Sequence, residues 1–247
     1  MTDLKFLQVI RTELNMVEQE LEKEMSLRTG HINQFVSLDL DTLDKYFCPS
    51  LVLLSGRLFG CRSRRLVSLA CVVQFIHLAT LVHNQAGKKP AFPVLVGDYL
   101  YSKFFHYLSR HDSLAMLAPL SKVICDIHEA GITRYQLEKT GQVDMRAYIP
   151  VVQREWGRLA EQACSIGGKV AGAGEEEEAR LRELGFNLGV AWGIQRLGLE
   201  EKLVTKHLSR AKEVLFLLPD RKEREYFLEL INLLQVKPEE IHKILAV

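Results

Sequence analysis

The sequence predicts an all-α fold, a helical bundle in a single domain over residues 1–247. Apolar residues recur at spacings of three and four along most of the chain, and no stretch shows the alternating pattern of a strand. Breaks rich in Gly, Pro or Asp separate these periodic segments. With 247 residues and 47% hydrophobic content, the chain is long enough to bury one large core.

The first segment, residues 1–30, is expected to be an amphipathic helix that ends at Gly30. Its apolar stripe consists of Leu4, Leu7, Ile10, Leu14, Val17 and Leu21. Such a stripe either docks onto the core of the same chain or packs against a second subunit. Leu7, Ile10 and Leu14 are the candidate interface residues for the second alternative.

The next helix is expected within residues 39–59, with Pro49 in the first turn of a long helix that starts near Cys48. Ser63 is placed to cap the helix after it, which runs to about His83. Further helices are expected over residues 94–108, 114–138, 145–170, 175–197, 202–217 and 221–245. Residues 71–82 and 186–194 should be the most deeply buried.

Residues 66–82 are about as long and apolar as a minimal membrane span. Gln74 and His77 in the middle favour a buried core helix instead, so no transmembrane span is expected. His77 and His83 are then interpreted as core histidines with satisfied hydrogen bonds.

The net charge is +1, from 32 basic and 31 acidic side chains, which excludes a general attraction to nucleic acid. The cluster of Arg57, Arg62, Arg64 and Arg65 fits an RNA or phospholipid patch, but the composition favours a solvated helix junction. Five cysteines without a C-x-x-C pair indicate reduced thiols, and the first residues lack a secretory signal. We therefore expect a cytoplasmic protein.

Several segments between about Asp44 and Leu199 resemble trans-polyprenyl diphosphate synthases, in the order of that family. Residues 49–55 are similar to the G-K-x-x-R-P-x-L helix start, with Lys45 on the lysine and Cys48 on the arginine. Residues 74–85 resemble E-x-I-H-x-x-x-L-I-H-D-D, residues 97–100 resemble G-D-Y-L, and residues 185–195 resemble the approach to the second aspartate-rich motif. The resemblance implies the isoprenoid synthase fold.

In that family, two D-D-x-x-D motifs hold Mg²⁺ ions, which take up the charge developing on an allylic diphosphate while isopentenyl diphosphate attacks. Each motif sets carboxylates one helical turn apart on one face. Amides are poor substitutes for them, because Mg²⁺ prefers anionic oxygen.

The family's polar residues are replaced at separate points of this chain. The first motif reads Asn84 and Gln85, the second reads Arg196 and Leu197 with only Glu200 as a carboxylate, and the Lys-Thr pair is Glu155 and Trp156. Arg134 falls on a family glutamine, and Lys88 and Lys89 are either a remnant of a basic pair or solvated lysines. No catalytic residue and no metal ligand is therefore expected here.

A few family positions are retained. Lys45 and His77 correspond to the isopentenyl diphosphate pocket, although a lysine and a histidine without the arginine make a weak anion site. Ala79 and Thr80 precede the lost first motif, where the family sets chain length by side-chain bulk. They are the candidate tunnel residues.

The resemblance implies a small, non-catalytic subunit (component I) of a heterodimeric heptaprenyl or hexaprenyl diphosphate synthase, active only with a large catalytic subunit that binds the Mg²⁺. It would contact the prenyl chain and shape product length for the menaquinone side chain. One alternative is a stand-alone prenyltransferase with Asp98, Glu129, Glu155 or Glu200 as unconventional Mg²⁺ ligands. The other is a module that binds a prenyl chain or another protein.

Overall fold

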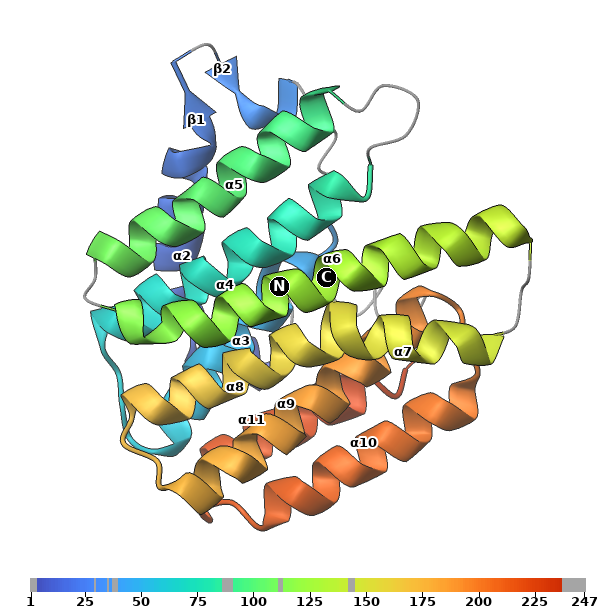
Figure 1. Ribbon diagram of the computed structural model, residues 1–247. Helices are drawn as coiled ribbons and strands as arrows, with labels where there is room; N and C mark the ends of the chain where they lie inside the picture. Colours follow the sequence, from blue (N-terminus) through green and yellow to red (C-terminus); the bar gives the residue numbers. More distant parts are fainter. Residues whose placement is uncertain are drawn as a thin grey trace.

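The computed structural model describes residues 4–28, 30–34, 36, 40–85, 91–110, 113–141 and 145–236, and these are mostly helical (Figure 1). The α-helices are α1 (Lys5–Val9), α2 (Arg11–Met25), α3 (Thr42–Leu58), α4 (Arg64–His83), α5 (Ala91–Arg110), α6 (Leu117–Thr140), α7 (Ile149–Val152), α8 (Arg158–Val170), α9 (Glu175–Arg196), α10 (Glu201–Phe216) and α11 (Glu223–Leu233). Short elements are β1 (Ser26–Leu27), β2 (Gly30–His31), η1 (Ile32–Gln34), η2 (Leu114–Met116), η3 (Met145–Tyr148) and η4 (Gln153–Gly157). The all-α prediction is confirmed.

Helices α3, α4, α8 and α9 form the centre of the bundle, and the other helices cover them (Figure 1). α5 packs on α4, α10 packs on α9, and α2 lies across α3 and α4. Within the described residues, one helix, α4, is long enough and apolar enough to cross a membrane. In the fold, 83% of its most apolar stretch is buried. That burial is expected of a core helix.

The N-terminal segment differs from the single helix predicted for residues 1–30. The helix is interrupted at Ile10, between α1 and α2, and it ends at Met25. An antiparallel pair of two-residue strands follows, with Ser26 opposite His31, although no strand was predicted. Gly30 has φ of 130°, a conformation that favours glycine, so this residue serves the hairpin and does not end the helix.

The apolar stripe of this segment packs internally. Ile10 is 0% exposed, Leu14 is 4% exposed, and both belong to the chain's own core, while Leu7 is half-buried. Of the two alternatives for the stripe, docking onto the same chain is therefore the one found for Ile10 and Leu14. Charged substitutions there would disturb folding before they could report on an interface.

Helix α3 begins at Thr42, earlier than the start near Cys48 that Pro49 suggested. Asp41 caps α3 by accepting a hydrogen bond of 2.7 Å from the backbone N–H of Asp44. Pro49 lies inside the helix, where it removes one backbone donor. At the next helix, Ser63 caps α4 as predicted, since its hydroxyl accepts from Leu66 N.

The segment predicted as one helix over residues 145–170 is divided into η3, α7, η4 and α8. η4 is a π-helical turn, and α9 packs closely against it and against α8. The close approach depends on Gly185, Gly189 and Gly193, which lie one turn apart on α9. A Cβ atom at Gly189 would lie 2.4 Å from the backbone oxygen of Trp156.

The cysteines are free thiols in the structure. Cys48, Cys71 and Cys164 are buried, and Cys125 is exposed on α6. Burial raises the pKa of the thiols of Cys71 and Cys164 to about 12.

Candidate functional site

The positions that correspond to the two aspartate-rich motifs lie at one end of the bundle. Helices α4 and α9 run in the same direction, so their carboxyl ends, at Asn84 and Arg196, lie at the same end of the bundle (Figure 1). Lys88 and Lys89, in the loop after α4, lie outside the described residues.

The first cluster is centred on Arg134 of α6. One guanidinium nitrogen of Arg134 donates a hydrogen bond of 2.6 Å to Asn84 Oδ1, and another donates one of 3.2 Å to Glu155 Oε2. Arg134 therefore bridges Asn84 and Glu155, two side chains that are far apart in the sequence. The cluster joins the end of α4 to α6 and η4.

Glu155 is the buried member of this cluster. It lies in the π-helical turn with 4% exposure, and its Oε1 atom is buried and accepts no hydrogen bond from the described residues. Burial raises the pKa of Glu155 to about 7, and Glu138 adds to this effect, although the Arg134 charge opposes it. The carboxyl group therefore titrates near neutral pH.

The second cluster is centred on Arg196, at the last residue of α9. Its Nη1 atom lies 3.0 Å from Asp41 Oδ2 and 2.8 Å from Asp44 Oδ1, at the start of α3. His77 Nε2 lies 3.5 Å from Asp44 Oδ1, and the His77 ring lies 5.3 Å from the Trp192 ring, with the two planes tilted by 43°. Burial alone would raise the pKa of Asp44, but contact with His77 and Arg196 outweighs it, so this pKa is lowered.

Both clusters consist of ion pairs and hydrogen bonds among the chain's own side chains. Arginine is permanently protonated and makes several directional hydrogen bonds, so each guanidinium occupies oxygen atoms of the carboxylates around it. Each also adds a positive charge at positions where a cation site would require negative oxygen. In the described part of the chain, no group of three or more His, Cys, Asp or Glu residues could hold a metal ion.

Three of the four alternative Mg²⁺ ligands, Asp98, Glu129 and Glu155, each contact a basic side chain of this chain. Asp98 lies inside α5, and its carboxylate is 3.3 Å from His83 Nε2. Glu129 pairs with Arg154 at 3.5 Å. Glu200 is exposed at the start of α10. Glu155 pairs with Arg134 as described above.

The remaining candidate residues lie on α4, just after it, and at the end of α9. Ala79 is fully buried, whereas the Thr80 hydroxyl lies 3.5 Å from the Tyr101 hydroxyl of α5. The rings of Tyr101, His83 and His128 are 5.5 Å apart from one another. Gln85 is exposed and Leu197 is half-buried at the C-cap of α9.

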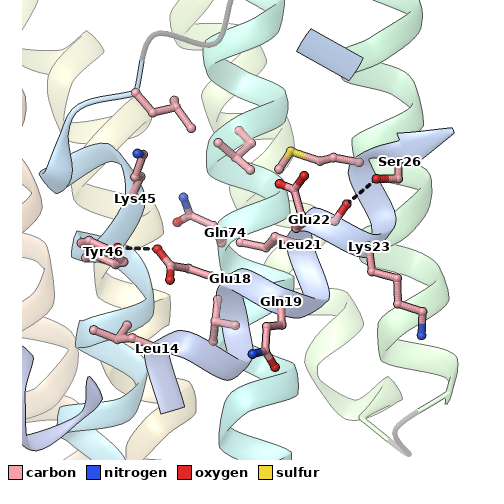
Figure 2. Close-up of a pocket in the computed structure, with 14 residues that line it drawn as sticks. Leu14, Glu18, Gln19, Leu21, Glu22, Lys23, Ser26, Lys45, Tyr46 and Gln74 are labelled. Atoms are coloured by element: carbon pink, nitrogen blue, oxygen red, sulfur yellow. Dashed lines mark hydrogen bonds between the residues drawn. The ribbon is translucent and has the colours of Figure 1, made fainter. Parts of the chain in front are cut away.

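Lys45 does not line a common cavity with His77. It is exposed on α3 and borders a pocket of about 650 Å³ between α2, α3 and α4 (Figure 2). His77 is 3% exposed and is oriented toward Asp44 and Trp192. This pocket could not be predicted from the sequence, because it forms where the amphipathic helix α2 crosses α3 and α4, which lie later in the chain.

Comparison with known proteins finds similarity in sequence and in fold. The polyprenyl synthetase family model matches residues 83–196. Octaprenyl diphosphate synthase of Escherichia coli is 29% identical over 159 residues, covering 58% of this chain and 49% of that protein. Heptaprenyl diphosphate synthase component 2 of Geobacillus stearothermophilus is 24% identical over 197 residues, covering 74% of this chain and 62% of that protein. The chain thus spans about half to three fifths of the length of these relatives.

Solved structures show the same fold. The decaprenyl diphosphate synthase from Rhodobacter capsulatus superimposes with a TM-score of 0.80 at 20% identity, covering 96% of this chain and 98% of that chain. A deletion mutant of a heterotetrameric geranyl pyrophosphate synthase from mint superimposes with a TM-score of 0.70 at 20% identity, covering 91% of this chain and 98% of that chain.

Proposed function

We propose that the chain is a non-catalytic partner subunit of a long-chain prenyl diphosphate synthase, a proposal supported by the match of the polyprenyl synthetase family model to residues 83–196. The large subunit would bind Mg²⁺ and condense isopentenyl diphosphate with allylic diphosphates. This chain would complete the assembly and influence product length. A hepta- or hexaprenyl product for the menaquinone side chain is the product class that we propose, and the cytoplasm is the proposed location.

The observation that carries this proposal is the pair of arginine clusters at the positions of the aspartate-rich motifs. Arg134 is hydrogen-bonded to Asn84 and Glu155, and Arg196 is hydrogen-bonded to Asp41 and Asp44. A bound Mg²⁺ ion would be repelled by these guanidinium groups, and the carboxylates are already paired. The fold is thus preserved while the charges at this end oppose the family's metal chemistry.

The exposed apolar surface supports association with a partner. Large hydrophobic side chains with more than 40% exposure are concentrated on α5, η2 and α6: Phe92, Val94, Leu95, Phe105, Leu114, Ile132 and Tyr135. Exposed apolar surface of this extent is typical of protein interfaces. Two similar proteins are named as parts of assemblies, a heptaprenyl synthase component 2 and a heterotetrameric geranyl pyrophosphate synthase.

The proposal is tested by an assay of the chain alone, the metal-competent homologue alone, and their mixture. Each sample receives farnesyl diphosphate, isopentenyl diphosphate and Mg²⁺, and product length is measured by chromatography. We expect no product from this chain alone, and longer products or higher turnover from the mixture. Size-exclusion chromatography with light scattering reports whether a heterodimer forms.

Two results would contradict the proposal in different ways. Turnover by the purified chain alone would support the stand-alone prenyltransferase with unconventional Mg²⁺ ligands. Absence of a heterodimer and of any effect of mixing would leave the module that binds a prenyl chain or another protein. An Arg134→Gln, Arg196→Gln double variant of this chain is assayed beside it. It tests whether the chain has turnover of its own once the two guanidinium charges that repel Mg²⁺ are removed.

A further inference from the structure

The pocket between α2, α3 and α4 has the composition of a site for an amphiphile with an uncharged head. Its volume of about 650 Å³ lies within the range of small-molecule sites. Six of its lining residues are apolar: Leu14, Val17, Leu21, Met25, Leu40 and Leu78. The polar residues of its lining belong to all three helices (Figure 2).

Gln74 supplies a buried polar atom without a partner. The residue is 1% exposed, and its Nε2 donates a hydrogen bond of 2.7 Å to the backbone oxygen of Asp44. That bond fixes the orientation of the amide, because only the nitrogen end can donate to a carbonyl. Oε1 is then left buried among the pocket-lining residues, and it accepts no hydrogen bond within the described part of the chain. A buried acceptor without a donor is unfavourable, and a ligand that donates a hydrogen bond would relieve this cost.

The charges around the pocket disfavour an anionic head group. Lys45 and Lys23 are balanced by Glu18 and Glu22, and all four side chains line the pocket. The Tyr46 hydroxyl donates to Glu18, and His31 pairs with Glu22 at 3.2 Å. Among the described residues that line the pocket there is no arginine, whereas diphosphates are usually held by several arginine or lysine donors.

We propose that this pocket binds a single-chain lipid alcohol. Its hydroxyl would donate a hydrogen bond to Gln74 Oε1 and accept one from the Lys45 ammonium group. Its chain would lie against Leu14, Val17 and Leu21 of α2. The proposal concerns a site apart from the two arginine clusters, and it does not require the partner subunit.

Binding is tested with the full chain by isothermal titration calorimetry, using farnesol and 1-dodecanol as probes. Farnesyl methyl ether is the matched ligand control, because it retains the apolar chain and the acceptor oxygen but lacks the donor. We expect one molecule of alcohol per chain and at least tenfold weaker binding of the ether. Equal binding of the two alcohols would support a fatty alcohol as source, and preference for farnesol would support an isoprenoid.

Two variants test the assigned contacts. Gln74→Met retains side-chain volume but removes the acceptor together with the donor to the Asp44 backbone oxygen. Lys45→Met removes only the ammonium group, from an exposed position where folding is not at risk. Each should weaken farnesol binding about tenfold, whereas Lys212→Met, exposed on α10, should leave it unchanged. Circular dichroism reports whether Gln74→Met remains folded.

The proposal is overturned if neither alcohol binds, if the ether binds as tightly as farnesol, or if Lys45→Met has no effect. Tighter binding of farnesyl diphosphate than of farnesol would also overturn it, since the head group would then be anionic. None of these results bears on the mixed synthase assay, so the failure of one proposal is distinguishable from the failure of the other.

Discussion

Protonation of Glu155, in the cluster around Arg134, makes the stability of the fold depend on pH. The carboxyl group is buried, and its pKa is raised from 4.5 to about 7 in the folded chain. The folded chain therefore binds more protons than the unfolded chain between these two values. The free energy of unfolding should fall as the pH rises through this window, by up to about 3 kcal/mol.

We predict that Glu155→Gln removes this pH dependence. The variant should match the wild type near pH 4.5 and be more stable at pH 8, because a neutral amide resembles the protonated carboxyl group. Urea unfolding at pH values from 4.5 to 8 measures the difference. Glu176→Gln, whose side chain is 79% exposed, is the matched control, and parallel curves for wild type and Glu155→Gln would contradict the prediction.

At the scale of single residues, the sequence predicted a helix cap but not the contacts between distant side chains. That Asn84, Gln85 and Arg196 replace motif residues stays a prediction, whereas the assignment of Ser63 as a cap is confirmed. The contact of Arg134 with both Asn84 and Glu155 could not be predicted, because the three residues are brought together only by packing of α4, α6 and η4.

At the scale of elements, the packing of α9 on α8 and η4 depends on small residues. Gly189→Ala would place a Cβ atom 2.4 Å from the Trp156 carbonyl oxygen, a backbone atom that cannot move without shifting η4. We predict a loss of about 2 kcal/mol or more in the free energy of unfolding. Thermal and urea unfolding measure it.

Gly131→Ala is the matched control for that substitution. Gly131 lies inside α6, and its nearest neighbour to an added Cβ atom is 4.0 Å away. Alanine should stabilise this helix by about 0.5–1 kcal/mol, because it restricts the unfolded chain. Equal destabilisation by the two substitutions would mean that the close approach of α9 does not matter.

Most helices were predicted close to their observed bounds, and the errors have local causes. Pro49 was expected to mark a first turn, but the capping box of Asp41 and Asp44 starts α3 earlier. The π-helical turn η4 and the hairpin at Gly30 leave no periodicity that a sequence pattern could reveal. The helix predicted over residues 221–245 is shorter in the structure, because α11 ends at Leu233 and residues 234–236 are not helical. Residues 237–245 lie outside the described residues.

At the scale of the whole molecule, the exposed apolar surface of α5 and α6 gives a testable interface. Leu95 is 64% exposed and Ile132 is 61% exposed. If this surface contacts the large subunit, Leu95→Asp and Ile132→Asp should each weaken the heterodimer by about tenfold, which corresponds to about 1.4 kcal/mol. Folding should be unaffected, because both side chains are already in solvent.

Analytical ultracentrifugation of mixtures at several concentrations measures the association. Leu217→Asp, at a residue 56% exposed beside α10, is the control on the opposite part of the surface. If all three substitutions have the same small effect, the contact lies elsewhere. The stripe of Ile10 and Leu14 is not a suitable probe, since both residues are buried in the core.

The distribution of the thiols makes unfolding of this molecule directly observable by chemical labelling. Cys48, Cys71 and Cys164 are buried in α3, α4 and α8, and burial keeps their pKa values well above neutral pH. Maleimide should react quickly with exposed Cys125 and only slowly with these three, since a buried thiol must first be exposed and ionised. Mass spectrometry of the labelled chain would report how often the central helices open. Saturation of the chain with a lipid alcohol or a partner should slow the labelling of the three buried thiols together.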